Sequence, residues 1–134
     1  MKKTSLLLIL ILTSCWNNEN ETEVITGNYF IGWADQIANR SITYSEDKEH
    51  LYHEGLVEGY VFAVGNNNSY IIAKQHPNTS DTIVTKYFII DINKKAYKNR
   101  GTVYGPMSES EFRKKTTELN ISDIKFNKVY IENP

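Results

Sequence analysis

The sequence predicts an α+β fold that is mainly β, with an antiparallel sheet of about five to seven strands and one C-terminal helix packed on it. Three observations support this prediction. Aromatic residues make up 12% of the 134 residues and include nine Tyr, and they favour strands together with Ile and Val. Short apolar runs alternate with polar, turn-forming stretches. A convincing helical stripe occurs in one segment, at about residues 108–119.

The first predicted strand is NYFIGW at residues 28–33, which is rich in aromatic residues. Ile42 and Tyr44 indicate a second, short strand, and a charged stretch after it is expected to form a loop or a single helical turn. Residues 58–64 and 70–75 are strand-like and lie on either side of the sequence GNNNS. Gly and Asn accept the positive φ angles of tight turns, so these two runs predict a β-hairpin.

The strongest predicted strand is TIVTKYFIIDI at residues 82–92, which follows a loop at residues 76–81. Its apolar run at residues 87–90 lacks the alternation of a half-exposed strand. We therefore expect this strand to be covered on both faces. A last strand is expected in the alternating tail at residues 123–132.

The helix at about residues 108–119 has local signals at both ends. Ser108 and Glu111 have the spacing of a capping box, in which each side chain bonds the backbone N–H of the other residue. Asn120 is expected to end the helix. Phe112 and Leu119 lie on one stripe, which predicts that this face packs on the sheet.

The N-terminal residues are expected to direct export and not to join the fold. Lys2 and Lys3 precede an apolar run at residues 5–12, which is far shorter than the roughly 20 residues of a membrane-spanning helix. A buried helix would show a polar face, which this run lacks, so a signal peptide over residues 1–14 is favoured. Residues 15–24 are expected to form an acidic, flexible tether, and residues 25–134 a single globular domain.

The sequence LTSC at residues 12–15 resembles the lipobox of bacterial lipoproteins. The resemblance implies cleavage between Ser14 and Cys15, transfer of diacylglycerol to Cys15, and acylation of the new amino terminus, for example by palmitate. No other cofactor is expected. Each buried CH2 contributes about 0.8 kcal/mol, so two or three chains would hold the protein stably on a membrane. The expected location is the cell membrane or outer membrane, facing outside the cytoplasm. Trp16 stands where the common inner-membrane retention signal has Asp, so that signal is absent.

Composition and motifs argue against several activities. The formal net charge is −1 without a long basic block, so nucleic acid is not an expected partner. Cys15 is the only cysteine, so its acylation would leave no thiol for a disulfide, a nucleophile or a metal site. The chain contains no GxSxG sequence and no glycine-rich phosphate loop. We therefore expect the protein not to be an enzyme.

One sequence feature keeps a metal site as an alternative. His50 and His53 could share a helix face, with Glu54 as a third ligand. The HExxH pattern is absent, and His76 lies in a distant loop. Solvated loop residues are therefore the favoured interpretation, and no metal is expected.

Three polar residues at strand ends are candidates for ligand binding. Lys74 and Gln75 end a predicted strand before a loop, where the alternative is a strand terminus that faces solvent. Asp91 ends an apolar strand, where the alternative is a turn cap over Asn93 and Lys94.

Three stretches resemble a family of small, uncharacterised bacterial lipoproteins, domain of unknown function family 3997. They are YIIAKQHP at residues 70–77, YFIIDI at residues 87–92, and the YGP motif that leads into the helix at residues 104–112. The resemblance covers the C-terminal half well and the first half loosely. It implies a lipid-anchored, β-rich domain and implies no activity.

These observations favour a membrane-anchored binding module that presents aromatic side chains to an envelope protein or a glycan. An inhibitor or immunity-type protein that guards the envelope is an alternative within the same class. The alternative from a different class is a metal-dependent enzyme or metal-binding protein that uses His50 and His53.

Overall fold

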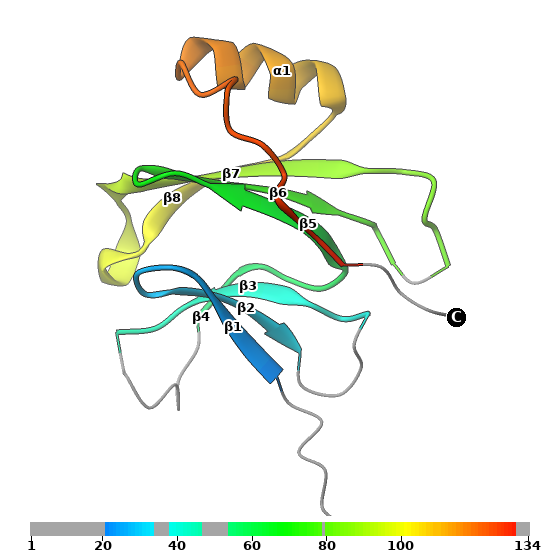
Figure 1. Ribbon diagram of the computed structural model, residues 1–134, viewed down its shortest axis with the longest axis horizontal. Helices are drawn as coiled ribbons and strands as arrows, with labels where there is room; N and C mark the ends of the chain where they lie inside the picture. Colours follow the sequence, from blue (N-terminus) through cyan, green and yellow to red (C-terminus); the bar gives the residue numbers. More distant parts are fainter. Residues whose placement is uncertain (1–20, 34–37, 47–53, 79, 131–134) are drawn as a thin grey trace, which may run out of the picture.

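The computed structural model describes residues 21–33, 38–46, 54–78 and 80–130, which form two antiparallel sheets and one α-helix (Figure 1). Sheet 1 has the order β1-β2-β3-β4 and contains β1 (Glu21–Thr26), β2 (Tyr29–Trp33), β3 (Ser41–Tyr44) and β4 (Glu54–Val57). Sheet 2 has the order β8-β7-β6-β5-β9 and contains β5 (Val61–Asn66), β6 (Tyr70–Gln75), β7 (Lys86–Lys95), β8 (Gly101–Met107) and β9 (Lys128–Val129). The remaining elements are η1 (Tyr97–Asn99) and α1 (Glu109–Glu118).

The predicted fold class is confirmed, since the described chain is mainly β with one helix. The strands form two sheets, where the sequence pattern predicted one. The division occurs between β4 and β5, within the stretch that was predicted as the start of a strand. Gly59 and Tyr60 there both have positive φ angles and form a left-handed turn.

This turn carries the chain from one sheet to the other. The φ angle is 73° at Gly59 and 55° at Tyr60, and the N–H of Gly59 donates a hydrogen bond to Oγ of Ser41 at 2.9 Å. Two consecutive left-handed residues reverse the backbone, so a regular strand begins only at Val61. Tyr60 is not a residue type that marks such a turn in a sequence, which explains why the run looked like a continuous strand.

The two sheets pack face to face over the main core. Its buried residues come from both sheets and are Tyr29, Ile31, Ile42, Tyr44, Val57, Val61, Val64, Ile71, Ala73, Phe88 and Ile90. A buried hydrogen bond also joins the sheets, because the N–H of Gly101 donates to the hydroxyl of Tyr29 at 2.8 Å. The sheets therefore form a sandwich (Figure 1).

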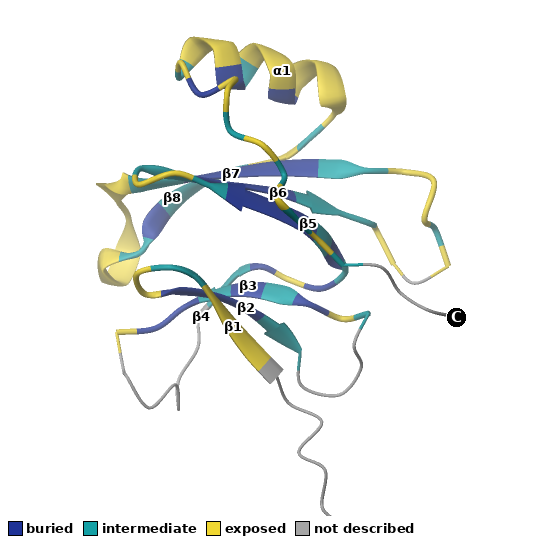
Figure 2. Ribbon diagram, viewed as in Figure 1, coloured by how far each residue is buried: buried dark blue, intermediate teal, exposed yellow. Residues whose placement is uncertain are grey.

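The helix α1 covers the other face of sheet 2 and makes a third layer (Figures 1 and 2). A second core lies between them and contains Ile72, Tyr87, Ile89, Phe112 and Ile121. In β7, Phe88 and Ile90 face the main core, whereas Tyr87 and Ile89 face the second core. The expectation that residues 87–90 are covered on both faces is thus confirmed.

Local chemistry sets both ends of α1 as predicted. The N–H of Glu111 donates to Oγ of Ser108 at 3.3 Å, and the N–H of Ser108 donates to the Glu111 carboxylate at 2.7 Å. Asn120 follows the helix with a left-handed φ of 55°. The N–H groups of Asn120 and Ile121 donate to the carbonyls of Thr117 and Thr116, which is the Schellman arrangement.

Several strand boundaries differ from the predictions, and the last strand, expected within residues 123–132, is only Lys128–Val129 within the described residues. Strand β1 begins at Glu21, so residues 21–24 of the predicted tether belong to sheet 1, where Val24 pairs with Phe30. Val24 is 52% exposed, so backbone pairing at a sheet edge holds this strand without an apolar pattern that a sequence would reveal. Strand β7 begins at Lys86, because Asp81 accepts hydrogen bonds from the N–H groups of Ile83 and Val84 and keeps them in a turn.

Candidate ligand-binding groove

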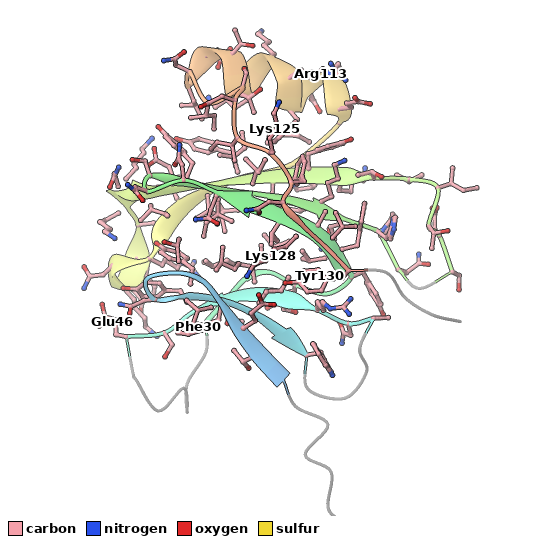
Figure 3. All side chains as sticks on the ribbon, in the orientation of Figure 1. Phe30, Glu46, Arg113, Lys125, Lys128 and Tyr130 are labelled. Carbon is pink, nitrogen blue, oxygen red and sulfur yellow. The ribbon has the colours of Figure 1, made fainter. Side chains whose placement is uncertain are left out.

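A groove of about 370 Å³ lies between α1 and the outer face of sheet 2. We call it the helix groove. It is lined by Lys74, Tyr87, Glu109, Phe112, Arg113, Thr116, Thr117, Ile121, Ser122, Ile124 and Phe126. Figure 3 shows Arg113 on the helix and Lys125 on the chain that descends from it. The groove therefore has three walls: the sheet, the helix, and the segment at residues 119–127, which we call the return segment.

Three aromatic rings form the floor of the helix groove. Tyr87 and Phe112 stack with their ring centroids 4.8 Å apart. Phe126 lies 6.0 Å from Phe112 and 6.5 Å from Tyr87, in tilted and edge-on orientations. These geometries are favourable for aromatic pairs, so the floor is an ordered apolar surface made by β7, α1 and the return segment.

Gly65 allows the return segment to lie close to sheet 2. A Cβ atom at this position would be 2.0 Å from the carbonyl oxygen of Lys125, which is far inside contact distance. The return segment then continues into β9, which pairs with β5. The absence of a side chain at Gly65 thus fixes where Ile124 and Phe126 stand in the groove wall.

The charged groups of the helix groove differ in how they are neutralised. Arg113 and Glu109 form an ion pair with an Nη2–Oε1 distance of 2.6 Å. The hydrogen bond from Arg113 is the main reason that the pKa of Glu109 is lowered. The Nζ atom of Lys74 lies 4.5 Å from the ring centroid of Phe126 and 5.7 Å from that of Tyr87. Among the described residues, Lys74 forms no ion pair.

The hydroxyl groups of the helix groove also divide into two kinds. Thr116 and Thr117 both donate to the carbonyl of Arg113 at 2.9 Å, so they serve the helix. Burial raises the pKa of the Tyr87 hydroxyl, with the charge of Glu109 as a smaller cause. Tyr87 is therefore a neutral hydrogen-bond donor at ordinary pH.

The structure places the three predicted binding residues in different environments. Lys74 lines the helix groove. Gln75 instead donates from Nε2 to the carbonyl of Glu58 at 2.8 Å and so supports the turn between the sheets. Asp91 accepts hydrogen bonds from the N–H groups of Asn93 and Lys94 at 3.1 and 3.0 Å, which is a turn-capping arrangement.

Other predicted site residues lie outside the described residues or have a described backbone alone. Ser14, Cys15, His50 and His53 are outside the described ranges. Glu54 begins β4, where its backbone pairs with Tyr44. Within the part of the chain that is described, no three His, Cys, Asp or Glu side chains come together as a group that could hold a metal ion.

Sequence reasoning missed most of the helix groove. Arg113, Tyr87 and Phe126 were not predicted as site residues, and Phe112 was predicted only as a core residue of the helix stripe. One signal could have linked them: Lys74 shares a strand face with Tyr70 and Ile72, the face that a packed helix would cover.

A second cavity of about 320 Å³ lies beside β5 and β9. It is lined by Ala38, Tyr60, Val61, Phe62, His76, Asn78, Thr82 and Tyr130. The rings of Phe62 and His76 stack there with centroids 4.0 Å apart. No Lys, Arg, Asp or Glu lines this cavity among the described residues, so it offers less charge-based selectivity than the helix groove.

The fold and the groove together define a small β-sandwich domain with one helix packed on its second sheet. The chain belongs to the family described as protein of unknown function (DUF3997), whose model matches residues 26–130. This match confirms the predicted family. Neither the curated proteins nor the solved structures contain a match to the chain. In the described ranges, no helix has the length and apolar character needed to cross a membrane.

Proposed function

We propose that this protein is a lipid-anchored binding module of the bacterial envelope, without catalytic activity, and that it holds its partner in the helix groove. The observation that carries this proposal is the groove itself. It combines an aromatic floor with a lysine ammonium group that forms no ion pair among the described residues. An apolar surface with a small number of placed polar groups is typical of a ligand site.

The predicted anchor and the groove are compatible in space. Cys15 precedes the start of β1 by six residues, and an extended chain of that length spans at most about 20 Å. Strand β1 lies in sheet 1, whereas α1 lies beyond sheet 2 (Figure 1). The anchored strand and the groove are therefore on opposite sides of sheet 2, which supports a groove that remains open to a partner.

The chemistry of the groove supports binding more than catalysis. Among the described residues that line the groove, Glu109 is the one with a carboxylate. Arg113 holds the pKa of Glu109 below the usual value. A general base for reactions near neutral pH needs a pKa close to that pH, so Glu109 is poorly suited to this role. No observation in the described residues favours the inhibitor, immunity or metal alternatives over a binding module.

Metabolic labelling with palmitate tests the anchor. The wild-type protein should incorporate label and run at the size of the cleaved form. Cys15→Ser should remain uncleaved and unlabelled, because the variant lacks the thiol that is alkylated. Normal labelling of Cys15→Ser would contradict the anchor.

Crosslinked co-purification from intact cells tests the groove. Thr117 is exposed and lines the groove, so Thr117→Trp places a large ring in it without disturbing the core. Asn93→Trp, at an exposed position on β7, is the matched control. The wild type and the control should recover the same discrete partner, and Thr117→Trp should lose it. Recovery of that partner by Thr117→Trp at the wild-type level would rule the groove out.

A further inference from the structure

We infer that the helix groove binds a short acidic peptide segment of a partner protein, in which one carboxylate lies next to an apolar side chain. This inference rests on the proposed function and names its ligand class. It follows from the position of Lys74, from the ion pair beside it, and from the aromatic floor.

Lys74 supplies the anion-binding group. Its ammonium lies against the rings of Phe126 and Tyr87, and the residue is half-buried, so the cation is partly shielded from water. Aromatic faces attract the cation but leave its hydrogen-bond donors available. A ligand carboxylate would satisfy them with a charge-assisted hydrogen bond, which is about twice as strong as a neutral one.

The ion pair in the groove wall sets the charge that the ligand should carry. Arg113 and Glu109 neutralise each other across 2.6 Å, which leaves Lys74 as the excess charge among the described groove residues. A single carboxylate balances one ammonium group. A cationic ligand would meet Lys74 without compensation, and a doubly charged phosphate would keep one negative charge that the groove does not balance.

The apolar residues of the groove select a side chain beside the carboxylate. Phe112, Ile121 and Ile124 line the groove together with Phe126, and its volume of about 370 Å³ suits a short segment. A peptide with Asp or Glu next to Leu, Ile, Val or Phe supplies a carboxylate for Lys74 and an apolar side chain for the groove from two adjacent residues. Ser122 and Thr117 are exposed at the rim, where they can meet the peptide backbone.

Selection from a displayed library of random decapeptides on the purified full chain in detergent tests this inference. Two variants are used in parallel. Lys74→Met removes the groove ammonium and retains an apolar, unbranched side chain. Lys114→Met removes the same charge from an exposed position of α1 that does not line the groove. Thermal unfolding of each variant verifies that it is folded.

The enriched peptides should carry Asp or Glu beside an apolar residue. Their affinity, measured by fluorescence anisotropy, should fall about tenfold or more in Lys74→Met and in peptides with Gln for Glu, because a charge-assisted hydrogen bond is lost. Lys114→Met should bind as the wild type does. The absence of enriched peptides, enrichment without acidic residues, or equal binding by Lys74→Met would each overturn the inference.

The peptide library and the co-purification experiment can fail independently, so a wrong ligand class can be told apart from a wrong binding site. If Thr117→Trp loses a partner in cells while the selected peptides show no acidic preference, the groove is a binding site and the ligand class is wrong. If Thr117→Trp retains the partner and the library yields no peptide, both proposals fail.

Discussion

At the scale of single residues, Tyr29 joins the two sheets through one buried hydrogen bond. Its hydroxyl accepts from the N–H of Gly101 at 2.8 Å, and burial raises the pKa of that hydroxyl. Tyr29→Phe would leave the N–H buried without this acceptor, which should cost about 1–3 kcal/mol of unfolding free energy in urea denaturation. Tyr70→Phe is the control, since the Tyr70 hydroxyl has no hydrogen bond among the described residues, and it should change stability by less than about 0.5 kcal/mol. Equal losses in both variants would contradict the role given to this bond.

A second residue-scale link joins β1 to the end of the chain. Glu23 pairs with Lys128, and the hydroxyl of Tyr130 donates to Glu23 at 3.1 Å (Figure 3 labels Lys128 and Tyr130). The hydrogen bond from Lys128 is the main cause that lowers the pKa of Glu23. Burial, followed by the bond to Glu23, raises the pKa of Tyr130 to about 12.

This link should make stability depend on alkaline pH. The Tyr130 hydroxyl holds its proton more tightly in the folded state than in the unfolded state, where its pKa is near 10.0. The stabilisation is therefore complete below pH 10 and is lost as the pH rises towards about 12. Titration of tyrosinate absorbance in the wild type and in Tyr130→Phe should give a difference curve centred near 12. A difference curve centred near 10 would show that the Tyr130 hydroxyl is neither buried nor bonded to Glu23 as described.

At the scale of elements, the return segment depends on Gly65. An alanine Cβ would lie 2.0 Å from the carbonyl oxygen of Lys125, so the segment would have to move away from β5. Gly65→Ala should cost about 1–3 kcal/mol of unfolding free energy, as overpacked sites do. Amide hydrogen exchange should accelerate in α1 and in residues 121–129 more than in sheet 1. Unchanged stability and exchange would show that the segment does not rest on Gly65.

Elements with local signals were predictable from the sequence. The ends of α1 follow from Ser108, Glu111 and Asn120, whose side chains or backbone conformations act on residues within one turn. The β5–β6 hairpin follows in the same way, because Asn67 accepts hydrogen bonds from the N–H groups of Ser69 and Tyr70 at 2.8 Å. These features need no knowledge of the rest of the fold.

At the scale of the whole molecule, the layers were not predictable, because they depend on contacts between distant residues. The division into two sheets depends on a left-handed turn at Gly59 and Tyr60, and β1 is held by pairing at an edge. The helix groove joins Lys74, Glu109 and Phe126, which only the packing of α1 on sheet 2 brings together. Lys74 was predicted as a binding residue because it is a polar residue at the end of an apolar strand. The same signal also selected Gln75 and Asp91, whose side chains instead form hydrogen bonds that support turns.

In the proposed function, the partner contacts the helix groove, which lies on the side of the molecule away from β1. Photo-crosslinking in intact cells tests it most directly, with a photoreactive residue placed at Thr117 or Ser122 in the groove and at Thr22 in β1 as the control; all three positions are exposed. We expect a discrete adduct of one size from both groove positions and none from Thr22. Adducts from Thr22 with none from Thr117 or Ser122 would contradict it.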